Sequence, residues 1–181
     1  MRGNWADARE LDRRAATRRS TEKRAAAIER TVLLGAYVMR KLDDSKKLST
    51  SWRGRAIRCV RHEPVGPRPN LANWQAIDVH YDLDRSRREV LGARALCDMV
   101  IHSYIFLLLG AEDRSVAGFL VTSDTRRADG LWRIGVGDFV RLMEQTADDR
   151  PTSILMVRDD ETDEYEMWRG RGQPPEHRRK K

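Results

Sequence analysis

The side chains of this sequence best suited to chemistry are Arg94, Asp98 and His102, which interrupt its most apolar stretch, residues 91–110. A spacing of four residues stacks side chains on one face of a helix. In that arrangement Asp98 fixes the imidazole tautomer of His102, which is then poised for general acid–base catalysis, while Arg94 binds a phosphate or carboxylate. The alternative interpretation is structural, with the three groups satisfying one another and nearby buried backbone.

The order of these side chains is similar to the helical motif of HEPN-type ribonucleases, in which an arginine followed by a polar residue precedes a histidine. Here seven residues separate Arg94 from His102, and Cys97 stands beside Asp98 where the family has its arginine. The resemblance covers this one helix. It implies a small ribonuclease with Arg94, Asp98 and His102 as catalytic residues.

A second group with ligand chemistry lies in residues 71–83 and just beyond. If this segment is extended, alternate side chains share one face and suit a divalent cation; if it is a helix, they point in different directions. We favour a helix to about Tyr81, because Asn70 is a good helix cap. We therefore expect no metal site and no cofactor. The residues in question are Asp78, His80, Asp82 and Asp84.

The positive charge of the chain is concentrated at its ends. The formal net charge is +7, yet residues 31–166 hold twenty Arg or Lys against twenty-two Asp or Glu. Basic ends of this kind suit a salt-sensitive contact with a nucleic-acid backbone that reads no sequence. In the N-terminal segment, interleaved acidic residues also suit ordinary ion pairs on a solvated helix face. The candidate nucleic-acid-binding residues are Arg13, Arg14, Arg18, Arg19, Arg178, Arg179, Lys180 and Lys181.

Composition indicates a soluble bacterial protein of the cytoplasm. Arginine outnumbers lysine by 29 to 6, which is typical of a GC-rich coding genome. Cys59 and Cys97 form no CxxC pair and are expected to be buried free thiols. The N-terminal residues hold no apolar signal core, and the apolar run 104–109 is too short to span a membrane. The sequence contains no GxGxxG, GxxxxGK[ST], HExxH or GxSxG motif, so the common nucleotide-binding enzymes and hydrolases are disfavoured.

The pattern of helices followed by strands predicts an α+β fold, with a long N-terminal helix and further helices packed on a small, mainly antiparallel sheet. Three segments are expected: a basic helical arm over 1–24, a globular domain over 25–168, and a basic disordered tail over 169–181. Helical spacing of Ile28 and Val32 predicts that the second half of the long helix packs on the core. The other expected elements are strands at 56–62, 104–109, 116–122 and 131–136, helices at 91–102 and 139–147, and a hairpin of 152–157 with 165–168.

The preferred functional hypothesis is a non-enzymatic accessory protein. The alanine-rich arm has too little apolar surface to bury alone, so we expect residues 1–44 to dock a partner protein or a second copy of the chain, with nucleic acid as a further component of the complex. The two alternatives are the small ribonuclease and a nucleic-acid binder that uses both basic ends.

Overall fold

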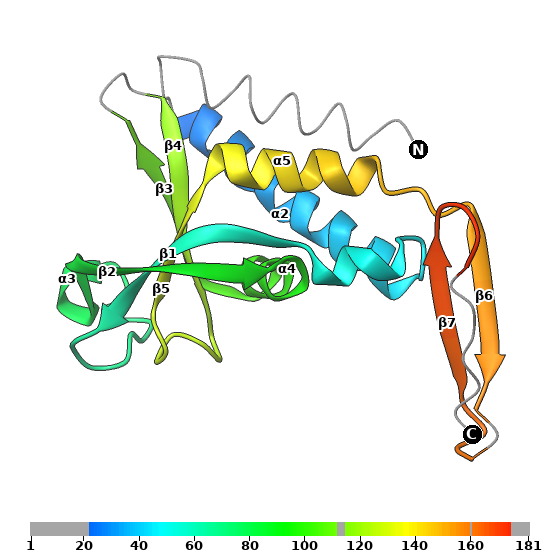
Figure 1. Cartoon of the computed structure of the whole chain (residues 1–181). Coiled ribbons are helices and arrows are strands. Elements are labelled where there is room, and N and C mark those ends of the chain that lie inside the picture. The colour runs from blue at the N-terminus through cyan, green and yellow to red at the C-terminus, as the bar shows by residue number, and fades with distance from the viewer. Residues whose placement is uncertain (1–21, 112–114, 160, 175–181) are drawn as a thin grey trace.

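The computed structural model describes residues 22–111, 115–159 and 161–174. Within them the fold is α+β, as the sequence predicts, and Figure 1 shows its arrangement. The helices are α2 (Glu22–Asp44), α3 (Ile77–His80), α4 (Ala93–Ile101) and α5 (Val136–Ala147), with a 3-10 turn η1 (Thr50–Gly54). The strands are β1 (Ala56–Pro64), β2 (Tyr81–Gly92), β3 (Ser103–Gly110), β4 (Val116–Ser123), β5 (Leu131–Gly135), β6 (Ser153–Arg158) and β7 (Tyr165–Gly170).

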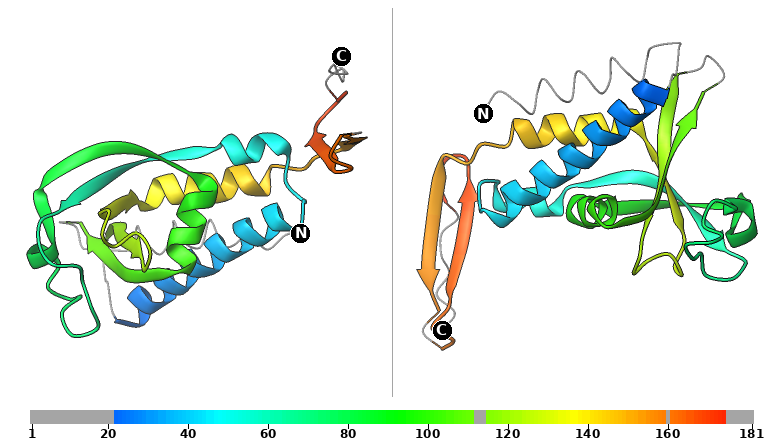
Figure 2. Two further views of the ribbon diagram at one scale, coloured as in Figure 1. Left: turned by 90° about the horizontal axis from the view of Figure 1, so that it is seen from below. Right: turned by 180° about the vertical axis from the view of Figure 1, so that it is seen from behind.

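Strands β1 to β5 form one antiparallel sheet in the order β2-β1-β5-β4-β3. The link from β2 to β3 therefore runs from one edge of the sheet to the other, and α4 makes this crossing. Helices α4 and α5 contact the sheet, and α2 packs on both of them. All three helices lie on the same side of the sheet (Figures 1 and 2). No described helix is long and apolar enough to cross a membrane.

The main core lies between the sheet and these helices. In α2 the buried residues Ile28, Val32 and Met39 recur at helical spacing, so one stripe of the helix faces inward. Strand β4 contributes Phe119 and Val121 from alternate positions. The expectation that the second half of the long helix packs on the core is confirmed.

A smaller core lies on the opposite face of the sheet. Leu120, which alternates with the residues that face the helices, packs there with Ile77 and Tyr81. The segment 65–80 supplies the cover, and Trp74 packs against the same cluster. This segment covers one part of the open sheet face and leaves the rest exposed.

The least accurate part of the sequence prediction is residues 71–92. The predicted helix to about Tyr81 is wrong apart from the four residues of α3, and β2 begins at Tyr81. The side chain of Asn70 accepts a hydrogen bond from the Ala72 backbone N–H (2.9 Å), so it caps a turn instead of a helix. The full strand β2 was not predicted, because its exposed, charged middle lacks an apolar alternation.

Strands β6 and β7 form a separate two-stranded sheet that projects from the body (Figure 1). The hairpin is where the sequence places it, and β7 continues two residues past the predicted end, to Gly170. The backbone N–H of Arg169 donates to the Thr50 hydroxyl (2.9 Å), which ties the base of the hairpin to η1.

Candidate functional site

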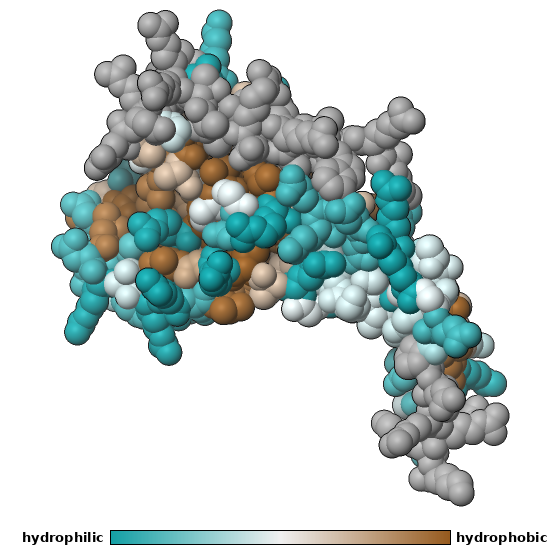
Figure 3. Space-filling model, turned by 45° about the horizontal axis from the view of Figure 1, so that its top comes forward, coloured by the Kyte–Doolittle hydropathy of each residue, from teal (hydrophilic) through white to brown (hydrophobic). Residues whose placement is uncertain are grey.

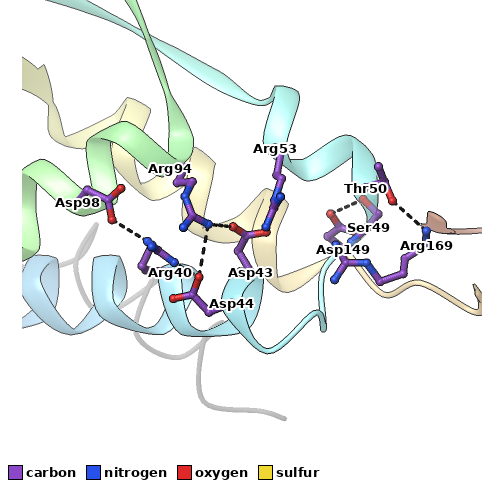
Figure 4. A network of polar contacts seen from close by, with 10 residues as sticks. All are labelled: Arg40, Asp43, Asp44, Ser49, Thr50, Arg53, Arg94, Asp98, Asp149 and Arg169. Atoms are coloured by element: carbon purple, nitrogen blue, oxygen red, sulfur yellow. Dashed lines mark hydrogen bonds and ion pairs between the residues drawn. The ribbon is translucent and has the colours of Figure 1, made fainter. Parts of the chain in front are cut away.

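The predicted Arg94 and Asp98 lie on α4 where it packs against the last turns of α2 (Figure 4). Both are partnered by α2. The Arg94 guanidinium pairs with Asp43 and, at 3.4 Å, with Asp44, while the Asp98 carboxylate accepts a 2.6 Å hydrogen bond from Arg40 Nε. The two α4 residues are thus joined to Arg40, Asp43 and Asp44 of α2. Arg53 also pairs with Asp43, and we call these six charged groups the α2–α4 network.

Asp43 is the centre of the α2–α4 network. Its side chain is fully buried and accepts from two guanidinium groups, Arg53 Nε at 2.9 Å on one oxygen and Arg94 on the other. Burial acts to raise the pKa of Asp43, but the hydrogen bonds from Arg53 and Arg94 outweigh it and hold that pKa below its usual value. The group stays ionised at neutral pH and is unsuited to deliver a proton.

Arg40 joins the two acidic residues at the exposed side of the network. It pairs with Asp44 one helical turn away and donates to Asp98. The hydrogen bond to Asp44 is the largest cause of a raised pKa at Arg40, although partial burial opposes it. The guanidinium groups and carboxylates are therefore mutually neutralised ion pairs, which favours the structural interpretation of Arg94 and Asp98.

His102 stands apart from this network. It follows the last residue of α4, where its backbone N–H donates to the Asp98 carbonyl (3.0 Å), and its side chain is exposed. Within the described residues no hydrogen bond or ion pair joins the imidazole to Arg94 or Asp98. The structure brings Arg94 and Asp98 to α2 and leaves His102 without the carboxylate that an acid–base dyad requires.

The acidic and histidine residues at 78–84 do not gather into one site. Asp78 and His80 belong to α3, whereas Asp82 belongs to β2 and accepts hydrogen bonds from the backbone N–H groups of Asp84 and Arg85. No group of three His, Cys, Asp or Glu residues suited to a metal ion occurs in the described part of the chain. His80 is instead a buried structural residue that holds the segment 65–80. Its ring nitrogens lie 2.7 Å from the Pro67 carbonyl oxygen and 3.0 Å from that of Asn73.

Both cysteines are free and buried, as predicted. Burial raises the pKa of the Cys59 thiol to about 11 and that of Cys97 to about 12. A thiol acts as a nucleophile in its deprotonated form, which is scarce at neutral pH for such values. Neither cysteine is therefore equipped for nucleophilic catalysis.

A second polar cluster lies where the hairpin leaves the body (Figure 4). The Ser49 hydroxyl donates to Asp149 (2.7 Å), which joins the start of η1 to the segment after α5. Arg169 is buried, and two of its guanidinium nitrogens have no hydrogen-bond partner in the part of the chain that the structure describes. This cluster was not found from the sequence, since its members come from three distant segments with no common motif.

The candidate nucleic-acid contacts at both ends of the chain fall outside the described residues. The structure places none of the eight.

Comparison of this chain with protein family models, with curated proteins and with solved structures found no match.

Proposed function

We propose that the chain is a non-enzymatic interaction protein that docks a protein partner through apolar side chains that its own fold leaves exposed. The observation that carries this proposal is the β6–β7 hairpin. Its strands pair with each other and with no other described strand. The register sets Leu155 opposite Trp168 on one face and Met156 opposite Met167 on the other, so both faces are apolar.

The hairpin exposes much of this apolar surface. Ile154 is 63% exposed, Met156 54% and Tyr165 62%. A two-stranded hairpin is marginally stable in water without further packing, and clustered exposed apolar side chains mark interaction sites. In Figure 3 a small hydrophobic patch lies on the projecting hairpin, separated from that of the body by hydrophilic surface. Docking of a partner supplies the packing that the hairpin lacks.

Helix α2 carries a second exposed apolar pair. Leu34 (55% exposed) and Tyr37 (56%) lie one turn apart on the helix whose opposite stripe is the core. This pair supports the part of the proposal that residues 1–44 also contact a partner or a second copy. Deletion of residues 1–24 tests the contribution of the arm, whose first 21 residues lie outside the described chain.

The α2–α4 network favours a non-enzymatic protein over a ribonuclease. Arg94 and Asp98 are neutralised by α2 groups, so they are poor candidates for binding and activating a phosphodiester. The free, buried thiols suit a reducing compartment, and we place the protein in the cytoplasm of a bacterium.

The test is co-purification with a tagged chain from its native host. The double variant Ile154→Asp/Met156→Asp is expected to lose the associated protein, because it places charge on the docking face. A matched control is Val65→Asp/Leu71→Asp, which changes two exposed apolar residues on the body (61% and 86% exposed) and should keep it. Equal loss in both variants would contradict docking through the hairpin. An RNA-cleaving activity removed by His102→Ala would replace the proposal with the ribonuclease.

A further inference from the structure

We propose that the acidic tip of the β6–β7 hairpin docks into an arginine-lined groove on the open sheet face of a second copy of this chain. The inference rests on the proposed function, since it names the partner of the same hairpin.

The groove is a cavity of about 820 Å³ on the part of the sheet face that the segment 65–80 leaves uncovered. Its lining includes Val60 and Leu109, with Gly110 and Gly118 on the two neighbouring strands β3 and β4. Gly110 leaves its side-chain position open, whereas Gly118 lets the backbone of β4 approach the Ile134 carbonyl oxygen closely. The apolar residues offer a surface for hydrophobic contact.

Three arginines surround this floor. Val60 on β1 pairs with Arg88 of β2 on one side and with Arg133 of β5 on the other, so the side chains of Arg88, Val60 and Arg133 stand in a row across the sheet. Arg58 lies two residues before Val60 and points to the same face. All three arginines are exposed, and within the described residues none of their guanidinium groups has a hydrogen bond or ion pair.

The carboxylates in the groove lining are already engaged. Glu89 accepts a hydrogen bond from Trp132 Nε1 (3.0 Å), and Asp138 pairs with Arg141 (2.9 Å). The groove therefore presents a positive surface with an apolar floor. An occupant that matches it carries several carboxylates next to apolar side chains.

The hairpin has this composition. Residues 153–170 contain two arginines and six acidic residues, a net charge of −4. At the tip Arg158 is paired with Asp163 (2.5 Å), whereas Glu161 and Glu164 are exposed and their carboxylates have no partner among the described residues. The exposed Tyr165 stands directly beside them. The tip thus offers free carboxylates and apolar surface together.

The tip that enters a groove belongs to a different copy of the chain. In both views of Figure 2, and in Figure 1, the hairpin projects from one end of the molecule and the sheet lies at the other. The tip of a chain is therefore out of reach of its own groove. Two copies that exchange tips reciprocally form a closed two-fold dimer. If each tip instead enters the groove of the next copy, the contact is heterologous, and the assembly either closes into a ring or extends as a filament whose terminal copies keep a free groove or a free tip.

The experiment is charge reversal followed by sedimentation velocity at low and high ionic strength. The wild-type chain is expected to associate with rising concentration and to dissociate at high salt. Arg88→Glu/Arg133→Glu and Glu161→Lys/Glu164→Lys should each weaken association about tenfold or more. An equimolar mixture of the two variants should associate again, because the unchanged tip of the groove variant meets the unchanged groove of the tip variant, and the reversed groove meets the reversed tip. The control Arg85→Glu/Arg87→Glu reverses two charges of β2 outside the groove lining and should associate like the wild type.

Three results would overturn the inference: a wild-type chain that is monomeric at every concentration, association unaffected by the groove variant, or mixed variants that stay apart. A groove that binds an RNA oligonucleotide without self-association would also overturn it, in favour of a nucleic-acid site. If the wild type is monomeric but still co-purifies another protein through its hairpin, the second copy is excluded and the proposed function stands.

Discussion

At the scale of single residues, the important feature is a pair of acidic side chains at the C-terminal end of α2. Asp43 and Asp44 close α2, where the negative end of the helix dipole disfavours carboxylates. Arg40 and Arg53, together with Arg94 from α4, offset this cost. The same arrangement explains why α4 docks against the last turns of α2.

The variant Asp43→Asn tests this role. Asparagine keeps the shape, but its amide N–H₂ then faces the donors of Arg53 or Arg94 in a buried site. We expect the free energy of unfolding to fall by about 2–3 kcal/mol, measured by urea denaturation. Asp44→Asn, at a side chain that is 45% exposed, is the control and should lose less. Equal losses would show that burial of Asp43 is unimportant.

The same variant should change the response to acid. Because the pKa of Asp43 is lowered in the folded state, its contribution is complete above the unfolded value of about 3.9 and is lost as pH falls through the folded-state pKa. The stabilities of the wild type and Asp43→Asn should therefore converge below that window. A difference that stays constant down to the acid transition would contradict the assigned ion pairs.

Sequence reasoning identified Arg94 and Asp98 but not their true partners. Their spacing showed that they share a helix face, and it suggested pairing within that helix. The partners lie more than fifty residues earlier, in the last turns of α2. Two acidic residues in a final helical turn were the available signal, since they require neighbouring cations.

At the scale of elements, segments with a strong apolar periodicity were predicted well, whereas the exposed strand β2 was predicted poorly. The apolar run 91–110 was correctly divided into a helix and a strand, apart from Leu91 and Gly92, which end β2, because its first half has a helical stripe and its second half does not. Strand β2 is an edge strand, and its middle faces solvent on both sides. This segment is a strand because its backbone is hydrogen-bonded to β1, and that pairing cannot be read from the residues of β2 alone.

Contact between α2 and α5 depends on a residue without a side chain. A Cβ atom at Gly35 would lie 2.9 Å from Met143 Cε and 3.4 Å from Phe139. Gly35→Val should therefore displace the end of the Met143 side chain, crowd the α2–α5 contact and lower the free energy of unfolding by about 1–2 kcal/mol, measured by thermal or urea denaturation.

A compensating substitution makes this prediction specific. Met143→Ala opens space opposite Gly35, so the double variant should lose less stability than the sum of the two single variants. Simple additivity would show that the two residues do not oppose each other across the α2–α5 contact.

At the scale of the whole molecule, the packing of the body does not require the hairpin, whereas the hairpin is held in place by the body. Both hydrophobic cores are built from residues that precede the hairpin. The hairpin buries Arg169 and Gly170 at its base and is held there by the bond to Thr50. The domain that the sequence predicts to begin at residue 25 thus has two parts, a body with its own hydrophobic cores and a hairpin that contributes to neither core.

A chain that ends at Arg150 should therefore keep its fold and lose the self-association that depends on the hairpin tip. It retains the Ser49–Asp149 hydrogen bond and every core residue, so cooperative thermal unfolding should persist with a melting temperature only a few degrees lower, since about 1 kcal/mol corresponds to roughly 2–4 °C at this size. Without the hairpin it has no acidic tip, and sedimentation should show a monomer. Because its groove remains, it should still cap the free tip of a full-length chain and shorten the assembly. A truncated chain that unfolds without cooperativity would show instead that the hairpin is part of the body's stability.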